Sequence, residues 1–372
     1  MTQASDPVGA SDTALTRIDG AHGILTYRGF RIEDVVAHLD YEAVVALLLR
    51  GPERDVGLVK EVTTELRARR ALPSTLQHLL NALPPDTPPI DGFRTAVSAM
   101  DDVSRVYPPT KREALELIAR SPTLVAHLHH ASMGSRPVAP DPGLGHVANY
   151  LWMVEGVRPT PERIRALERY FVLLADHGVS ASTYALRIVM STRSDLASAV
   201  SAALGALKGP LHGGAPPEVL EMLDAVGSVD GVEAWVDRTL EQRGRIFGFG
   251  HPIYRVEDPR ATLLRGFAKE VAAPHRYELA RRFEEVALER LALRRPDQRL
   301  FTNVDFYGAV LLEAVGLPRS LFTPTFALAR TVGWSAHALE QVAQGRLVRP
   351  PERYIGPAPR PWDDGRGPEG RV

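Results

Sequence analysis

Helical spacing of apolar residues runs through almost the whole chain and limits the folds that are available to it. Clear alternation of apolar and polar residues, which is typical of strands, is nearly absent outside residues 23–32. The sequence therefore predicts a mainly α fold with one small sheet element near the N-terminus. The main candidate helices are residues 41–49, 59–70, 111–118, 162–175, 181–190, 195–207, 232–242, 277–293 and 326–344.

Length and charge narrow the class of protein. The chain has 372 residues, enough for roughly two domains. Its formal net charge is -1 and its basic residues form no long block, which does not favour a nucleic-acid or membrane-surface partner. Residues 1–12 lack the basic segment followed by an apolar segment that is typical of a signal peptide. No apolar run is long enough to span a bilayer. We expect a cytoplasmic protein with a short frayed start and no nucleic-acid or membrane partner.

A glycine-rich turn between two helical runs holds the first candidate site residue. The sequence from Lys208 to Glu218 is Lys-Gly-Pro-Leu-His-Gly-Gly-Ala-Pro-Pro-Glu, so His212 should lie just ahead of a helix N-terminus. The partial positive charge there disfavours protonation of the imidazole. A neutral histidine can donate a hydrogen bond to a carbonyl oxygen and stabilise an enol. A loop histidine satisfied by water or backbone fits the local sequence equally well.

Two later stretches hold further candidates. His251 lies in Gly-Phe-Gly-His-Pro at residues 248–252, which is a turn rather than a helix face, and a structural loop histidine is the alternative. Asp305 lies in Asn-Val-Asp-Phe-Tyr at residues 303–307. Burial among these apolar neighbours would make its carboxylate the stronger base that removal of a C–H proton requires. Taken alone, the local sequence favours an N-cap acid for the helix that follows.

Together these motifs resemble those of the citrate synthase family. They occur in the family's order and at similar spacing, and the resemblance extends from Arg17 to Gly356. It implies a mainly α fold in which a large helical domain, residues 1–212 and 320–372, carries a smaller inserted helical domain, residues 213–319. It also implies a homodimer, with the active site in the cleft between the two domains.

The resemblance further implies an activity and a set of roles. Citrate synthases are acyltransferases of the tricarboxylic acid cycle that condense acetyl-CoA with oxaloacetate and water, without a metal or redox cofactor. By resemblance, His212 hydrogen-bonds the thioester carbonyl of acetyl-CoA and Asp305 removes the α-proton. His251 protonates the ketone oxygen of oxaloacetate, and His177 corresponds to the family's other substrate histidine.

Arginines suit a dicarboxylate substrate because guanidinium groups bind carboxylates bidentately. Three stand where the family places substrate arginines: Arg260 in Asp-Pro-Arg, Arg330 in Arg-Thr-Val-Gly-Trp, and Arg349 before a proline. By resemblance, Arg349 would reach the active site of the partner subunit. No phosphate-binding glycine fingerprint is present, and we assign Arg255 as a contact to CoA phosphate. For each arginine, a solvated surface charge is the alternative.

The chain departs from the family pattern beside two of these residues. Gly178 follows His177 where the family has glutamate, and Ser180 stands where it has asparagine. A proline follows His251 where a basic residue is common. Loss of an acid and an amide could shift substrate choice or lower activity. Two alternatives therefore stay open: a 2-methylcitrate synthase that uses propionyl-CoA, and a non-catalytic homologue that binds CoA or a dicarboxylate.

A metal site is not predicted. His127, His129 and His130 form a histidine cluster, in which His127 and His130 are three positions apart on a helix and could bind zinc, but no acid or further histidine is near them in the sequence. The chain has no cysteine, which also excludes disulfides, thiolate ligands and a cysteine nucleophile.

Overall fold

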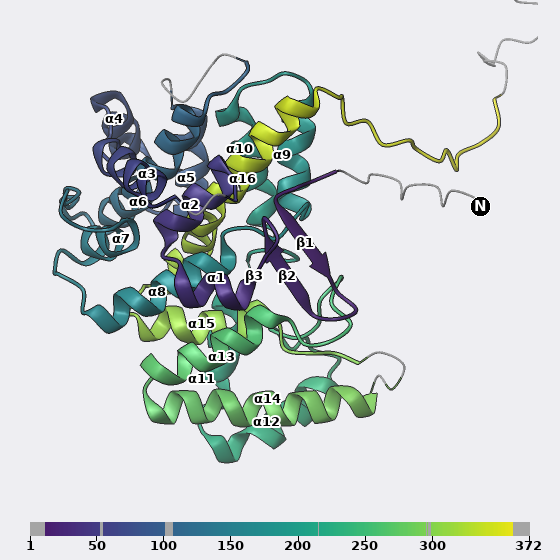
Figure 1. The fold of residues 1–372 in the computed structure, drawn as a ribbon. Coiled ribbons are helices and arrows are strands. Elements are labelled where there is room, and N and C mark those ends of the chain that lie inside the picture. The colour runs from purple at the N-terminus through teal and green to yellow at the C-terminus, as the bar shows by residue number, and fades with distance from the viewer. Residues whose placement is uncertain are drawn as a thin grey trace, which may run out of the picture.

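The structure is a computed structural model that describes residues 12–52, 55–100, 107–214, 216–294, 296 and 299–359. It confirms the mainly α fold (Figure 1). Nearly all of the expected frayed start, residues 1–12, lies outside the described residues. The strands are β1 (Thr16–Asp19), β2 (Ile24–Tyr27) and β3 (Phe30–Arg31). The helices are α1 (Ile32–His38), α2 (Tyr41–Arg50), α3 (Val56–Ala68), α4 (Ser74–Ala82), α5 (Pro89–Ser98), α6 (Lys111–Ser132), α7 (His146–Glu155), α8 (Pro161–Leu174), α9 (Ala181–Ser191), α10 (Leu196–Leu207), α11 (Pro216–Val226), α12 (Val232–Glu241), α13 (Pro259–Val271), α14 (Pro274–Arg294), α15 (Val304–Ala314) and α16 (Phe322–Gln344), with 3-10 turns η1 (Val229–Gly231) and η2 (Arg319–Leu321).

The small sheet is antiparallel, in the order β1-β2-β3. The β2–β3 connection is tight because Arg28 and Gly29 both have positive φ, the backbone that a two-residue hairpin turn requires. The sequence predicted β2 and β3 but missed β1. The hydroxyl of Tyr27 lies within hydrogen-bond distance of the carbonyl oxygens of Val172, Leu173 and Asp176, which fixes the sheet against the end of α8.

Helix α16 is the central element of the core. Most of its residues are buried, and it packs against α9, α6, α10, α8 and α2 (Figure 1). The closest approach is at Gly333, whose N–H donates to the carbonyl oxygen of Ala175 at 3.1 Å. A Cβ at this position would overlap that oxygen and lie 2.5 Å from Oδ1 of Asp176. Only glycine lets the helix approach the segment after α8 so closely.

Helix α6 is longer than the sequence predicted. The expected helix ended at residue 118. Pro122 lies beyond that point, and a proline disfavours a helix interior because it removes a backbone donor and crowds the preceding turn. The structure continues the helix through Pro122 to Ser132. Nearly all of residues 114–130 are buried, so tertiary packing outweighs the local cost of the proline.

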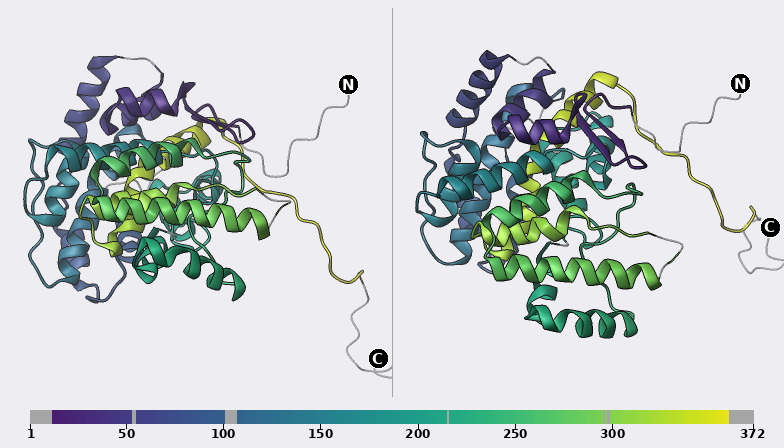
Figure 2. Two further views of the ribbon diagram at one scale, coloured as in Figure 1. Left: turned by 90° about the horizontal axis from the view of Figure 1, so that it is seen from below. Right: turned by 60° about the horizontal axis from the view of Figure 1, so that its bottom comes forward.

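The segment from α11 to α15 gathers on one side of the molecule. In Figure 1 and in the right view of Figure 2 these green helices lie together, below the helices that come earlier in the chain. Within the group, α15 packs against α13 and α11, and α12 packs against α14. The group meets the rest of the chain where α13 and α15 contact α8, where α13 contacts α1 and where α11 contacts α16.

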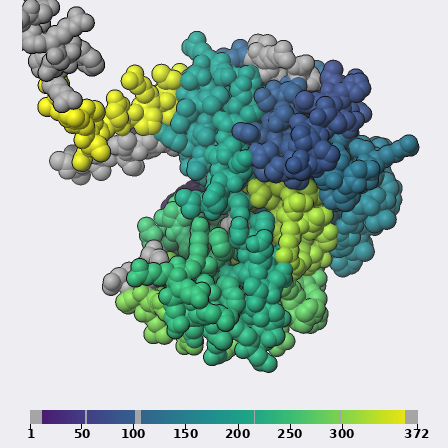
Figure 3. All heavy atoms as spheres, turned by 180° about the vertical axis from the view of Figure 1, so that it is seen from behind, coloured from purple at the N-terminus to yellow at the C-terminus, as the bar shows by residue number. Residues whose placement is uncertain are grey.

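The C-terminal residues leave the body of the molecule. Gly345, with φ +64, ends α16 in a left-handed cap, and the chain then runs outward without regular structure (Figures 2 and 3). Leu347, Tyr354 and Ile355 are exposed along it. Of the tail that the sequence predicted to be extended, residues 357–372, only residues 357–359 are described. Among the described helices, none is long and apolar enough to cross a bilayer.

Replacement of Gly333 by alanine tests the close approach of α16. The added methyl group must push α16 away from residues 175–176, and we expect a loss of about 1–3 kcal/mol in the free energy of unfolding. Gly266 in α13 is the matched control, because a Cβ there would meet nothing within 4 Å. Gly266→Ala should be neutral or raise stability by up to about 1 kcal/mol. Equal stability of the two variants in urea unfolding would contradict the packing argument.

Candidate active site

His212 lies in the turn between α10 and α11, as the sequence predicted. The turn is held by the N–H of His212, which donates to Gly209, and by the N–H of Gly213, which donates to Leu207. A Cβ on Gly213 would lie 2.6 Å from Cδ1 of Leu207, so glycine lets the turn fold back onto α10. The imidazole is half-buried, and its Nε2 lies 2.9 Å from Oγ of Ser182 at the start of α9.

Ser182 can set the tautomer of His212. The indole nitrogen of Trp334 lies 3.3 Å from the same Oγ and can only donate, so the serine oxygen accepts from it. The serine hydroxyl is then free to donate to Nε2 of His212. When the hydroxyl donates in this way, the imidazole proton sits on Nδ1, where it can serve a ligand. The sequence did not point to Ser182, because it lies 30 positions before His212.

Burial keeps His212 neutral. Loss of solvation is the main cause and the positive charge of Arg330 the second, and together they lower the pKa of His212 to about 4. The sequence had suggested the helix N-terminus as the cause. The outcome is the same: at neutral pH, His212 can donate or accept a hydrogen bond without carrying charge.

A short backbone pairing brings His251 and Asp305 to the same place. Phe249 and Thr302 form an isolated antiparallel bridge, and the N–H of Gly250 donates to the carbonyl of Phe301 at 2.7 Å. The N–H of Asn303 donates to Gly248 at 2.9 Å. Gly248 and Gly250 both have positive φ, which explains the glycines around this turn.

The cap of α15 leaves the carboxylate of Asp305 free. Asn303 is the N-cap residue, and its side-chain oxygen accepts from the N–H of Asp305 at 3.0 Å. The alternative role of Asp305 as the N-cap acid is therefore wrong. Burial raises the pKa of Asp305 to about 7, against the opposing charge of Arg260. Such a carboxyl is a much stronger base than an exposed aspartate and is still ionised in part at neutral pH.

Backbone contacts fix the tautomer of His251. The N–H groups of Ile253 and Tyr254 point at its Nδ1, at 3.1 and 3.3 Å, so this nitrogen is the acceptor. The proton of the neutral ring therefore sits on Nε2. Burial, followed by the charge of Arg260, lowers the pKa of His251 to about 4. His251 is a neutral hydrogen-bond donor at physiological pH.

Two buried arginines lie beside these groups. Asp258 holds Arg260 by two hydrogen bonds, from Nε at 3.1 Å and from Nη2 at 2.7 Å. Arg330 donates from Nε to the carbonyl oxygen of Leu174 at 2.7 Å. Both guanidinium groups are almost fully buried. Their hydrogen bonds among the described residues engage one edge of each, and the Arg330 group also lies over the ring of Phe326. The free edges can bind carboxylate oxygens bidentately.

His177 completes the cluster from the other side. It is buried after α8, its ring centroid lies 5.4 Å from that of His251, and its Nε2 lies 3.2 Å from the hydroxyl of Tyr254. Burial and then the charge of Arg260 hold its pKa well below the usual range. The structure thus brings together His177, His212, His251, Arg260, Asp305 and Arg330, which the sequence had singled out.

Comparison with known proteins gives the family. The sequence profile described as "Citrate synthase, C-terminal domain" matches residues 5–351. The chain is 36% identical to the citrate synthase of Acidithiobacillus ferridurans over 94% of both chains. The chain belongs to the citrate synthase family.

Two further relatives bear on what a member of the family can bind. The chain is 31% identical to the 2-methylcitrate synthase of Shewanella oneidensis over 94% of both chains. It also matches the structure of citrate synthase from Thermoplasma acidophilum in its ternary complex with carboxymethyl coenzyme A and oxaloacetate. That match has a TM-score of 0.87 and 30% identity and covers 95% of each chain.

The departure from the family pattern at Gly178 has a structural reason in this chain. Gly178 has φ +56, a left-handed conformation that favours glycine, and its N–H donates to Oδ2 of Asp176 at 3.0 Å. Glutamate at this position would be strained. The turn that carries His177 therefore rests on backbone geometry and on Asp176, a residue that the sequence reasoning missed.

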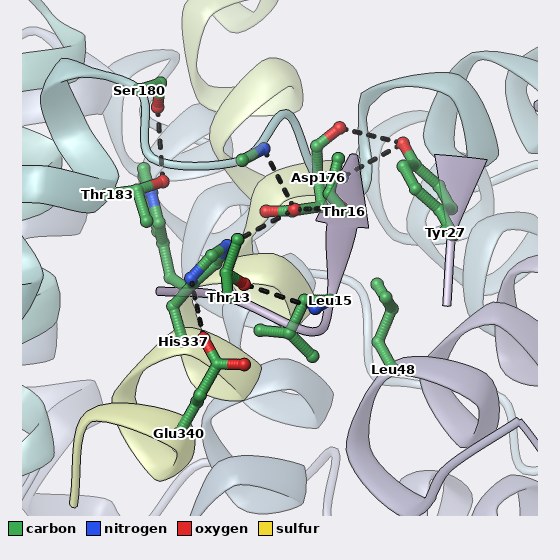
Figure 4. A network of polar contacts seen from close by, with 12 residues as sticks. Thr13, Leu15, Thr16, Tyr27, Leu48, Asp176, Ser180, Thr183, His337 and Glu340 are labelled. Atoms are coloured by element: carbon green, nitrogen blue, oxygen red, sulfur yellow. Dashed lines mark hydrogen bonds and ion pairs between the residues drawn. The ribbon is translucent and has the colours of Figure 1, made fainter. Parts of the chain in front are cut away.

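Asp176 is the centre of a buried polar network (Figure 4). Its Oδ2 accepts from the hydroxyl of Thr16 on β1 at 2.5 Å and lies 3.3 Å from Nε2 of His337 on α16. Arg187 donates to Nδ1 of His337 at 2.8 Å, so the ring proton is on Nε2 and faces Asp176. The network joins the sheet, α9 and α16 behind the turn of His177.

Two arginines lie apart from this cluster. Arg255 is exposed and lines a pocket of about 260 Å³ beside His251, together with Arg299, which the sequence reasoning missed. Arg349 is exposed on the C-terminal tail, and within this one chain the fold does not bring it to the cluster.

The histidine cluster on α6 is used for packing. Nε2 of His127 lies 2.8 Å from Oδ1 of Asn81, and His130 contacts Ser135 and the carbonyl of Met153. Among the described residues, no three His, Cys, Asp or Glu side chains are placed to hold a metal ion.

Proposed function

We propose that this acyltransferase is a citrate synthase, which condenses acetyl-CoA with oxaloacetate and water to give citrate and CoA. The observation that carries the proposal is a partly buried carboxyl, Asp305, with a pKa raised to about 7, in one site with two neutral histidines and two oriented arginines. This set supplies a base, hydrogen-bond donors and carboxylate ligands, which are the groups that the condensation requires.

Asp305 and His212 would form the nucleophile. Asp305 takes one methyl proton from acetyl-CoA, and Nδ1–H of His212 donates to the thioester oxygen as the enol develops. Neutral His212 suits this role because a hydrogen bond to a developing enol needs a donor of matched acidity rather than a full charge. The contact of Nε2 with Ser182 holds the ring in place.

His251 and the arginines would prepare the electrophile. Arg260, Arg330 and His177 bind the two carboxylates and the ketone of oxaloacetate, which lowers charge repulsion. The enol carbon attacks the ketone carbon, and Nε2–H of His251 protonates the ketone oxygen. Water then hydrolyses the citryl thioester and releases CoA. The side chains present suffice for these steps, and we assign no metal or redox cofactor.

CoA would lie along the pocket beside His251. We assign Arg255 as a phosphate contact, and Arg299 across the same pocket supports this placement. An exposed arginine pair beside a loop is a reasonable anion site, since the chain offers no glycine-rich phosphate loop.

The acyl group is acetyl on this proposal, with propionyl as the alternative. Both activities occur among the relatives, and the two substrates differ by one methylene, worth about 1–3 kcal/mol in an apolar pocket. The non-catalytic alternative rested on Gly178 and Ser180. The positive φ of Gly178 gives that substitution a backbone reason, so it does not argue against catalysis.

Residues 213–319 would act as a small domain that closes over a large one, residues 1–212 and 320–372. His251, Arg260 and Asp305 lie on the first part, and His177 and Arg330 on the second. Closure would exclude water until condensation is complete, so that the thioester is not hydrolysed early.

We further propose a homodimer. Helices α9 and α10 present half-exposed small and apolar residues on one face, which Figure 3 shows as a teal region of the surface. Such a face suits close packing against a second copy. The exposed apolar residues of the C-terminal tail support contact with that copy, and Arg349 would then enter the partner's site. The cytoplasmic location stays a prediction.

CoA release tests the proposed reaction. A thiol reagent, with oxaloacetate and either acetyl-CoA or propionyl-CoA, should report oxaloacetate-dependent release, and the protein adds no thiol of its own.

We expect Asp305→Ala to lower turnover by at least about 100-fold while oxaloacetate still binds. Glu313→Gln, at the other end of α15, is the control and should stay near wild type. No release from the wild type with either thioester would reject the proposed function, and near-normal turnover in Asp305→Ala would reject its role as the base.

Arg349→Ala tests the role of the tail. We expect KM for oxaloacetate to rise by about tenfold or more, because a charged carboxylate contact is lost, while the subunits stay associated in sedimentation. Arg353→Ala, four residues along the same exposed tail, is the matched control and should leave KM unchanged. Unchanged kinetics in both variants would reject the assignment.

A further inference from the structure

A buried carboxylate away from the substrate groups ties together the segments that carry the site. Glu284 on α14 is 2% exposed. Its Oε1 accepts from the hydroxyl of Thr302 at 2.6 Å and from Nη2 of Arg265 at 2.7 Å. Its Oε2 accepts from the hydroxyl of Tyr307 at 2.6 Å and from Nε of Arg265 at 3.1 Å. Both oxygens are thus fully used by short, charge-assisted hydrogen bonds.

Two of the donors flank the proposed base. Thr302 pairs with Phe249 in the bridge that leads to His251, and it precedes the cap of α15. Tyr307 lies in the first turns of α15, two residues after Asp305. One carboxylate therefore holds the chain on both sides of Asp305.

The third donor connects the remaining site segments of residues 213–319. Arg265 lies on α13, the helix that carries Arg260 in its first turn. It also pairs with Glu257, in the loop between His251 and Asp258. A shift of Glu284 would therefore be transmitted to the base and to the loop of His251 together.

We propose that Glu284 is a positioning residue for proton removal, which fixes the carboxylate of Asp305 relative to His251 and Arg260. The inference rests on the proposed function. It predicts that chemistry and binding are affected to different extents, because Arg260 keeps its two hydrogen bonds to Asp258 when Glu284 is changed. His177 and Arg330 lie after α8 and on α16, outside the segments that Glu284 contacts. Loss of Glu284 should impair chemistry far more than binding of oxaloacetate.

Glu284→Gln keeps the shape but replaces one acceptor oxygen by a donor, so the four hydrogen bonds cannot all be kept. We expect kcat to fall by roughly 10- to 100-fold, since a small misplacement of a catalytic group costs this much. The Kd of oxaloacetate should stay within about threefold of wild type. The deuterium isotope effect with trideuteroacetyl-CoA should rise, because removal of the methyl proton becomes more nearly rate-limiting.

Glu233→Gln is the matched control. Glu233 also pairs with an arginine of α14, Arg282, but the pair is exposed and touches no site segment. It should keep the wild-type kcat and isotope effect, as expected for a surface ion pair. Tyr307→Phe removes one donor from Glu284 and provides a second test if Glu284→Gln does not fold. It should show a smaller change in the same direction.

The outcomes are distinct. A folded Glu284→Gln or Tyr307→Phe with wild-type kcat and isotope effect would overturn the inference. So would parallel losses of kcat and oxaloacetate affinity, which indicate a general structural role. An inactive wild type would instead reject the proposed function itself, on which the inference depends.

Discussion

The close approach of α16 to the segment after α8 is the constraint on which the site depends. Gly333 allows a backbone contact to Ala175 that no larger residue permits. The groups that bind substrate in our proposal lie close to this contact: His177 is three positions past the end of α8, and Arg330 is three positions before Gly333. The N-terminal sheet adds to this joint, because the hydroxyl of Thr16 reaches Asp176 behind the same turn. Residues 1–212 and 320–372 thereby hold one half of the site in a fixed geometry, and residues 213–319 supply the other half.

Burial acts on the site in two opposite directions, and both serve the proposed chemistry. It lowers the pKa of His212 and His251 to about 4, so that both rings stay neutral donors. It raises the pKa of Asp305 to about 7, so that the carboxylate gains basicity. Fixed backbone and serine contacts then decide which ring nitrogen carries the proton. Desolvation thus suits His251 to act as the acid, His212 as the hydrogen-bond donor and Asp305 as the base.

The sequence could predict what is encoded in short motifs and could not predict what arises between distant segments. The glycine-rich turn of His212 and the turn of His251 follow from local residues. The sequence also allowed Asn303 to be chosen as the N-cap residue, because asparagine is favoured at that position. The prediction from the local sequence instead favours Asp305 as the cap. The hydrogen bond from Ser182 to His212 spans 30 positions and has no local signal. Helix α6 likewise continues through Pro122 because of tertiary packing, which helix propensities of single residues do not describe.

The most direct test of this account is the pH dependence of kcat/KM for acetyl-CoA, measured from pH 5 to 9 at saturating oxaloacetate. A carboxyl whose pKa is raised to about 7 loses its base form as the pH falls through that value. We therefore expect an acid limb governed by one proton at about pH 7, while His212 and His251, with pKa values of about 4, stay neutral throughout. A profile that is flat down to pH 5 would contradict it, because the base would then be an ordinary exposed carboxylate or another group.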